Sequence, residues 1–100
     1  VTKIFRSDVA KMNPFLSCSV ISSPDTPLEI KFNDKLIETI NTNAEGLALI
    51  KMEVPLKQLE KASFNTFTVN SYGTNLVSVL NFSLTSEDGY YIDVMKPYSK

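Results

Sequence analysis

Apolar residues at every second position are the feature that most constrains how this 100-residue chain can fold. In the segment 28–32, Leu28, Ile30 and Phe32 alternate with charged residues. A period of two places the apolar side chains on one face of an extended strand and the polar ones on the other. Similar alternation occurs in residues 50–54, 67–69, 80–84 and 90–95. The pattern predicts antiparallel sheets with one face on a core and the other in water.

Turn-forming residues punctuate the chain between these segments. The clusters of Gly, Pro, Asn, Asp and Ser lie at residues 13–14, 22–27, 33–34, 41–46, 55, 72–75 and 87–89. They leave short segments rich in Val, Ile, Leu, Phe and Thr, a composition typical of strands. About seven to eight strands at this spacing, without long helical crossovers, indicate an all-β antiparallel sandwich. Residues 3–5 form either an edge strand or a linker in this interpretation.

Three local signals predict how the strands connect. Asn33 and Asp34 tolerate the positive φ of a tight hairpin. Gly89 should supply positive φ in a turn at residues 86–89, where Asp88 should bond to nearby backbone amides. Residues 55–62 break the alternation, because a proline is followed by apolar residues at a spacing of three. This segment predicts one short helical turn near residues 56–61.

The alternation also predicts which side chains form the core. Tyr90 falls in register with Ile92 and Val94 and should pack inward, whereas Tyr91 and Asp93 should face water or a neighbouring module. The residues expected to be buried are Ile30, Phe32, Ile50, Met52, Val54, Phe67, Val69, Leu80, Phe82, Ile92 and Val94.

Length and charge bound the class of protein. One hundred residues predict a single β-sandwich domain over residues 1–100, and a start at Val1 without a methionine favours a fragment of a longer chain. The net charge is −1, and Glu60 interrupts the longest basic cluster, residues 57–61. Nucleic-acid binding normally requires a basic face, so it is not expected. No apolar run approaches the roughly 20 residues that span a bilayer.

The residue types present exclude several kinds of chemistry. The chain has no histidine and one cysteine, Cys18, which rules out His/Cys metal sites and a Ser-His-Asp triad. Cys18 without a histidine base reads as a small core residue rather than a nucleophile. A calcium site at Glu87 and Asp88 would need further carboxylates to converge, and solvated turn carboxylates are the preferred interpretation. We therefore expect no enzyme activity, no cofactor and no metal.

Tyrosines are the remaining candidates for a ligand surface. Together they could form a platform on which sugars stack, although they equally suit the rims of strands, and the chain has no tryptophan. The residues that we single out as a ligand or partner surface are Tyr72, Tyr91, Asp93 and Tyr98.

The middle of the chain resembles the immunoglobulin-like modules of bacterial surface proteins and phage virion proteins. Residues 36–54 and 64–71 carry the resemblance, with a tight turn at residues 43–46, a proline at Pro55 that ends a strand, and a later strand of the Phe-Thr-Val type. What the resemblance implies is an immunoglobulin-like sandwich that serves as a spacer, as decoration or in adhesion. It implies no shared site residues.

These observations together predict a non-catalytic structural, spacer or protein-attachment module of a larger extracellular, cell-surface or virion protein. Its expected partners are other protein modules of the same or another chain. The alternative is a carbohydrate-binding or other accessory module attached to an enzyme, with polysaccharide as its ligand.

Overall fold

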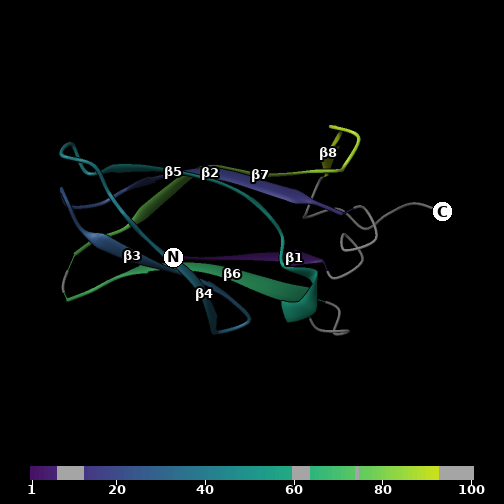
Figure 1. Ribbon diagram of the computed structural model, residues 1–100, viewed down its shortest axis with the longest axis horizontal. Coiled ribbons are helices and arrows are strands. Elements are labelled where there is room, and N and C mark those ends of the chain that lie inside the picture. Colours follow the sequence, from purple (N-terminus) through teal and green to yellow (C-terminus); the bar gives the residue numbers. More distant parts are fainter. Residues whose placement is uncertain (7–12, 60–63, 74, 93–100) are drawn as a thin grey trace.

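The computed structural model describes residues 1–6, 13–59, 64–73 and 75–92, apart from the side chains of Arg6, Tyr91 and Ile92. Figure 1 shows two layers of strands facing each other. The elements are β1 (Thr2–Arg6), β2 (Phe15–Ile21), β3 (Pro27–Phe32), β4 (Lys35–Asn41), β5 (Leu47–Glu53), the 3₁₀ turn η2 (Leu56–Gln58), β6 (Phe64–Ser71), β7 (Ser78–Thr85) and β8 (Tyr91–Ile92).

Each layer is a four-stranded sheet in which every pairing is antiparallel. The first sheet has the order β1-β6-β3-β4, and the second has the order β5-β2-β7-β8. The all-β class predicted from the alternation is therefore confirmed. Residues 3–5 belong to β1, an edge strand of the first sheet, which resolves the alternative left open above.

The predicted connections are also largely confirmed. Asn33 and Asp34 have φ values of 51° and 66°, and they join β3 to β4 in a tight hairpin. Pro55 follows β5 and directly precedes η2. The helical turn is a single 3₁₀ turn, shorter than the predicted 56–61, of which residues 60–61 lie outside the described residues.

Aromatic rings link the two sheets through the centre of the core. Phe32 lies 6.2 Å from Phe5 and 5.3 Å from Phe67, measured between ring centroids. Phe67 on β6 stacks on Phe82 of β7 in the opposite sheet, with centroids 5.6 Å apart. The buried apolar residues are Phe5, Leu16, Cys18, Val20, Leu28, Ile30, Phe32, Ile50, Val54, Phe67, Val69 and Leu84.

Six of the predicted core residues are buried, and one prediction is wrong. Met52 and Phe82 are partly buried against the core, but Leu80 is 45% exposed. The cause is a β-bulge in β7, where Ser19 pairs with Leu80 but Ser17 pairs with Ser83. The bulge adds one residue to β7, so the inward positions change from odd to even numbers along the strand.

The conformation of Asn81 marks this bulge. Its φ is 55°, a left-handed value that asparagine adopts more readily than most residues. Alternation in the sequence cannot reveal such an inserted residue. Extending the even-numbered pattern back from Leu84 therefore placed Leu80 on the wrong face.

The turn between β7 and β8 forms at the predicted residues but with a different side chain. Gly89 has a φ of +89°, and its N–H donates to the carbonyl of Ser86 at 2.9 Å. The hydroxyl of Ser86, rather than the carboxylate of Asp88, accepts the bond from the N–H of Tyr90, at 3.2 Å. Tyr90 precedes β8 and is 75% exposed, so the prediction that it packs inward is wrong. The side chains of Ile92 and Val94 lie outside the described residues.

A network of hydrogen bonds closes the opposite end of the sandwich. The buried hydroxyl of Thr42 donates to the carbonyl of Ser23 at 2.6 Å and accepts from the N–H of Thr26 at 2.8 Å. Asn43 Oδ1 accepts from the N–H groups of Glu45 and Leu47, at 2.8 and 3.0 Å. The predicted tight turn at residues 43–46 is thereby confirmed.

Gly46 is required in this turn for two reasons. Its φ is +83°, and a methyl group at its Cα would overlap the carbonyl oxygen of Ser22. We expect Gly46→Ala to lose substantially more unfolding free energy than Gly89→Ala. Gly89 has open space around its Cα. Gly89→Ala should therefore lose only the free energy that holds an alanine in the left-handed conformation, about 1–2 kcal/mol. Urea unfolding of both variants tests this, and equal losses would contradict the packing around Gly46.

Truncations on the two sides of the sheets test the register. Phe67→Ala should cost about 3–5 kcal/mol, because it opens a cavity in the centre of the core. Leu80→Ala should cost less than about 1 kcal/mol, because the bulge directs Leu80 to the surface. The measurement is the free energy of unfolding in urea. A loss at Leu80 as large as that at Phe67 would place the bulge elsewhere.

Candidate functional site

Of the tyrosines that the sequence singled out, the structure describes Tyr72 and the backbone of Tyr91, and these two positions lie apart. Tyr72 follows β6 and is 51% exposed. Tyr91 pairs with Thr85 at the far end of β7. An eight-residue strand spans roughly 25 Å, so positions 72 and 91 lie at opposite ends of the sandwich. Asp93 and Tyr98 lie outside the described residues.

One carboxylate near β8 takes part in a local contact. Glu87 accepts a hydrogen bond from the side-chain amide of Asn13 at 3.0 Å, which joins the β7–β8 turn to the segment before β2. Within the described ranges, no three side chains of His, Cys, Asp or Glu converge as a metal site would require. The carboxylate of Glu87 therefore serves to join these two segments.

Cys18 is enclosed in the core. It is 1% exposed. Burial raises the pKa of its thiol from 9.0 to about 11, and the nearby ammonium of Lys3 offsets part of this rise. The thiol is therefore protonated at neutral pH, the state that makes a cysteine a poor nucleophile.

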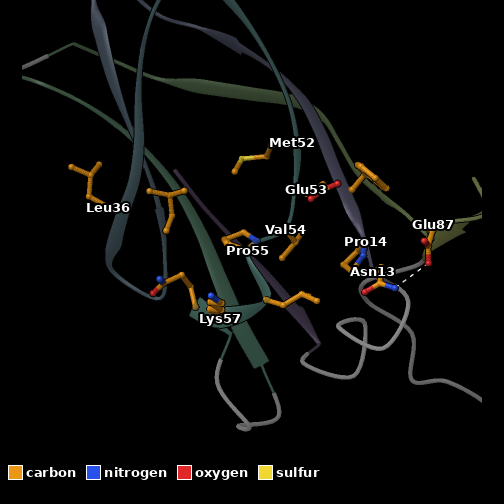
Figure 2. Close-up of a pocket in the computed structure, with 13 residues that line it drawn as sticks. Asn13, Pro14, Leu36, Met52, Glu53, Val54, Pro55, Lys57 and Glu87 are labelled. Carbon is orange, nitrogen blue, oxygen red and sulfur yellow. Dashed lines mark hydrogen bonds between the residues drawn. The ribbon is translucent and has the colours of Figure 1, made fainter.

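A groove lies where the edge strands of the two sheets, β4 and β5, face each other. Its volume is about 870 Å³, and Figure 2 shows the side chains that surround it. They are Asn13, Pro14, Phe15, Leu36, Ile37, Met52, Glu53, Val54, Pro55, Leu56, Lys57, Gln58 and Glu87. Most of these residues are apolar, and Glu53, Lys57 and Glu87 supply charges. The groove is not predictable from the sequence, because its residues come from separate segments that only the sandwich brings together.

One asparagine fixes the wall that η2 contributes to the groove. The side-chain amide of Asn33 donates to the carbonyl of Gln58 at 2.9 Å and to Oδ1 of Asn65 at 2.7 Å. Its own Oδ1 accepts from the N–H of Thr66 at 3.0 Å. The hairpin thus holds η2 against β6. The sequence indicates Asn33 as a turn former, and its additional contacts with Gln58 and Asn65 depend on the folded arrangement.

The groove offers apolar contact area and a few charges for orientation, which is the chemistry of a binding surface. The side-chain oxygen Oε1 of Gln58 is buried and has no hydrogen-bond partner among the described residues.

No described helix is long and apolar enough to cross a membrane. Comparison of the chain with protein-family models, with curated proteins and with solved structures found no match.

The state of Cys18 leads to a prediction about pH. The folded state keeps a proton that an unfolded thiol releases, so stability should be full below pH 9 and should fall as the pH rises through about 11. The measurement is the urea midpoint across this range for the wild type and for Cys18→Ala. The wild type should lose more stability than the variant, which lacks the thiol. Parallel curves, or rapid reaction of the native thiol with an aromatic disulfide reagent, would contradict the burial of Cys18.

Proposed function

We propose that this chain is a non-catalytic structural, spacer or protein-attachment module of a larger extracellular, cell-surface or virion protein. The observation that carries the proposal is the groove between β4 and β5, because it presents mainly apolar side chains at the surface of a closed sandwich. Exposed apolar surface of this kind usually marks an interaction site. The proposed partners are other protein modules.

The way polar side chains are used supports a scaffold. Hydrogen bonds to turns and loops at the ends of the sheets are formed by the side chains of Asn33, Thr42 and Asn43. The only thiol is enclosed in the core. Side chains committed to loop geometry favour a rigid module over a catalytic one.

The likeness to immunoglobulin-like modules is proposed at the level of architecture. Two antiparallel sheets packed face to face are common to such modules, which do not all share one topology. In antibody constant domains the first two strands lie in the same sheet. Here β1 and β2 lie in different sheets, so the order of strands differs from that arrangement.

The alternative, a carbohydrate-binding accessory module, draws on exposed aromatic rings. Tyr72 and Tyr90 both present their rings to solvent. A sugar platform needs rings that lie together. Tyr72 and the β7–β8 turn, which contains Tyr90, lie at opposite ends of β7, and this separation favours the first proposal.

Affinity electrophoresis in gels containing soluble plant and bacterial polysaccharides tests the choice. We expect the wild type to migrate as it does in polysaccharide-free gels, and Tyr72→Ala and Tyr91→Ala to migrate likewise. Retardation of the wild type that either substitution abolishes, with urea stability unchanged, would establish the carbohydrate-binding alternative.

A further inference from the structure

Four strands form the edges of the two sheets in the described part of the chain, and β5 is less protected than β1 and β4. Edge strands are commonly blunted by short length, bulges or inward-pointing charges. β1 carries Lys3 on the same side as the buried Phe5. β4 contains a bulge where its pairing with β3 shifts after Ile30. β5 pairs with β2 over seven residues without a shift in register.

The backbone of β5 directs one set of hydrogen-bonding groups away from its sheet. At one end of the β2–β5 ladder the N–H of Val54 donates to the carbonyl of Pro14, at 3.0 Å. At the other end the N–H of Ser22 donates to the carbonyl of Gly46, at 2.9 Å. Residues in an antiparallel strand alternate between bonding to one neighbour and facing the other side. Even-numbered residues of β5 therefore bond to β2, and odd-numbered residues present their backbone groups outward.

Three residues remain available at this edge. The backbone groups of Leu47 are taken by Asn43, whereas no other described residue bonds to the outward backbone groups of Leu49, Lys51 and Glu53. Leu49 is also 63% exposed. The charged side chains of Lys51 and Glu53 form no ion pair with another described residue. The edge thus combines open backbone groups, an exposed leucine and two opposite charges without partners.

We propose that a second copy of this chain pairs with β5 in an antiparallel arrangement, around a two-fold axis through Met52. This deepens the proposed attachment function, on which it rests, by naming the partner. In this register Lys51 lies opposite Glu53 of the second copy, and the pair occurs twice. Each pair can exchange both backbone N–H···O bonds, because both residues are odd-numbered.

Charge complementarity selects this register over its neighbours. An axis through Lys51 would place two lysines directly opposite each other, which is unfavourable. An axis through Ile50 would place each Lys51 opposite a leucine. Among these registers, only the axis through Met52 places an opposite charge across from both Lys51 and Glu53. Two-fold pairing of one patch with itself is the usual form of a dimer interface.

The groove adjoins the proposed interface. Met52 and Glu53 line it from β5, and the exposed Leu36 and Leu56 line it from β4 and η2. Figure 2 labels Met52, Glu53 and Leu36 among the residues that line the groove. A strand placed beside β5 lies along this groove, so the second copy shields apolar side chains that the single chain leaves in water.

Charge reversal tests the register. Sedimentation velocity of the 100-residue chain over a range of concentrations should reveal a monomer–dimer equilibrium that weakens at high salt. Glu53→Lys and Lys51→Glu should each weaken the dimer roughly tenfold, since two attractive pairs become repulsive. The double variant restores opposite charges and should recover the wild-type equilibrium. Glu38→Lys on the bulged edge β4 is the matched control and should have no effect.

A cross-link tests the axis independently. Residues facing each other at the centre of a non-hydrogen-bonded antiparallel pair have Cα atoms about 4.5 Å apart, which suits a disulfide. Met52→Cys should form a disulfide-linked dimer under mild oxidation, whereas Lys35→Cys on β4 should not. A chain that stays monomeric at all concentrations would overturn the proposal and leave β5 to an extended segment of another protein. A dimer indifferent to Lys51 and Glu53 would also overturn it, and neither result would change the polysaccharide test above.

Discussion

The contact between Phe67 and Phe82 across the two sheets is the interaction on which the rest of the structure depends. The only cysteine is unpaired, so no disulfide joins the layers, and apolar burial holds them together. Phe32 and Phe5 extend this contact along the first sheet. Because the rings set the position of one sheet over the other, they also set the separation of the edges β4 and β5 and hence the groove between them.

Hydrogen bonds at the ends of the sandwich complement this central contact. Thr42 is buried, and its hydroxyl both donates and accepts a hydrogen bond, so the buried hydroxyl is satisfied. Asn33 plays a similar part at the hairpin, where it ties η2 to the first sheet. Apolar burial in the core therefore holds the two sheets together but is not directional, and the hydrogen bonds of a few polar side chains determine the conformation of the loops.

Sequence periodicity was sufficient for strands that stay regular and insufficient where one residue is inserted. The alternation of residues 28–32 predicted both β3 and its buried face. In β7 the bulge at Asn81 reverses the faces, and no local pattern distinguishes it from an unbroken strand. The prediction that Tyr90 packs inward was wrong for a related reason, because the turn between β7 and β8 includes Tyr90. The groove could not be predicted at all, because it depends on how β4, β5 and η2 approach each other in space.

The pairing of β1 with β6 has a consequence for how the protein is made. Val1 donates its amino group to the carbonyl of Val69, 68 positions along the chain. During synthesis the N-terminal part of a chain leaves the ribosome before the parts that follow it. Of the described strands, β1 therefore emerges first and waits without its partner until β6 is available. Meanwhile the β3–β4 hairpin is the earliest sheet contact that the nascent chain can form.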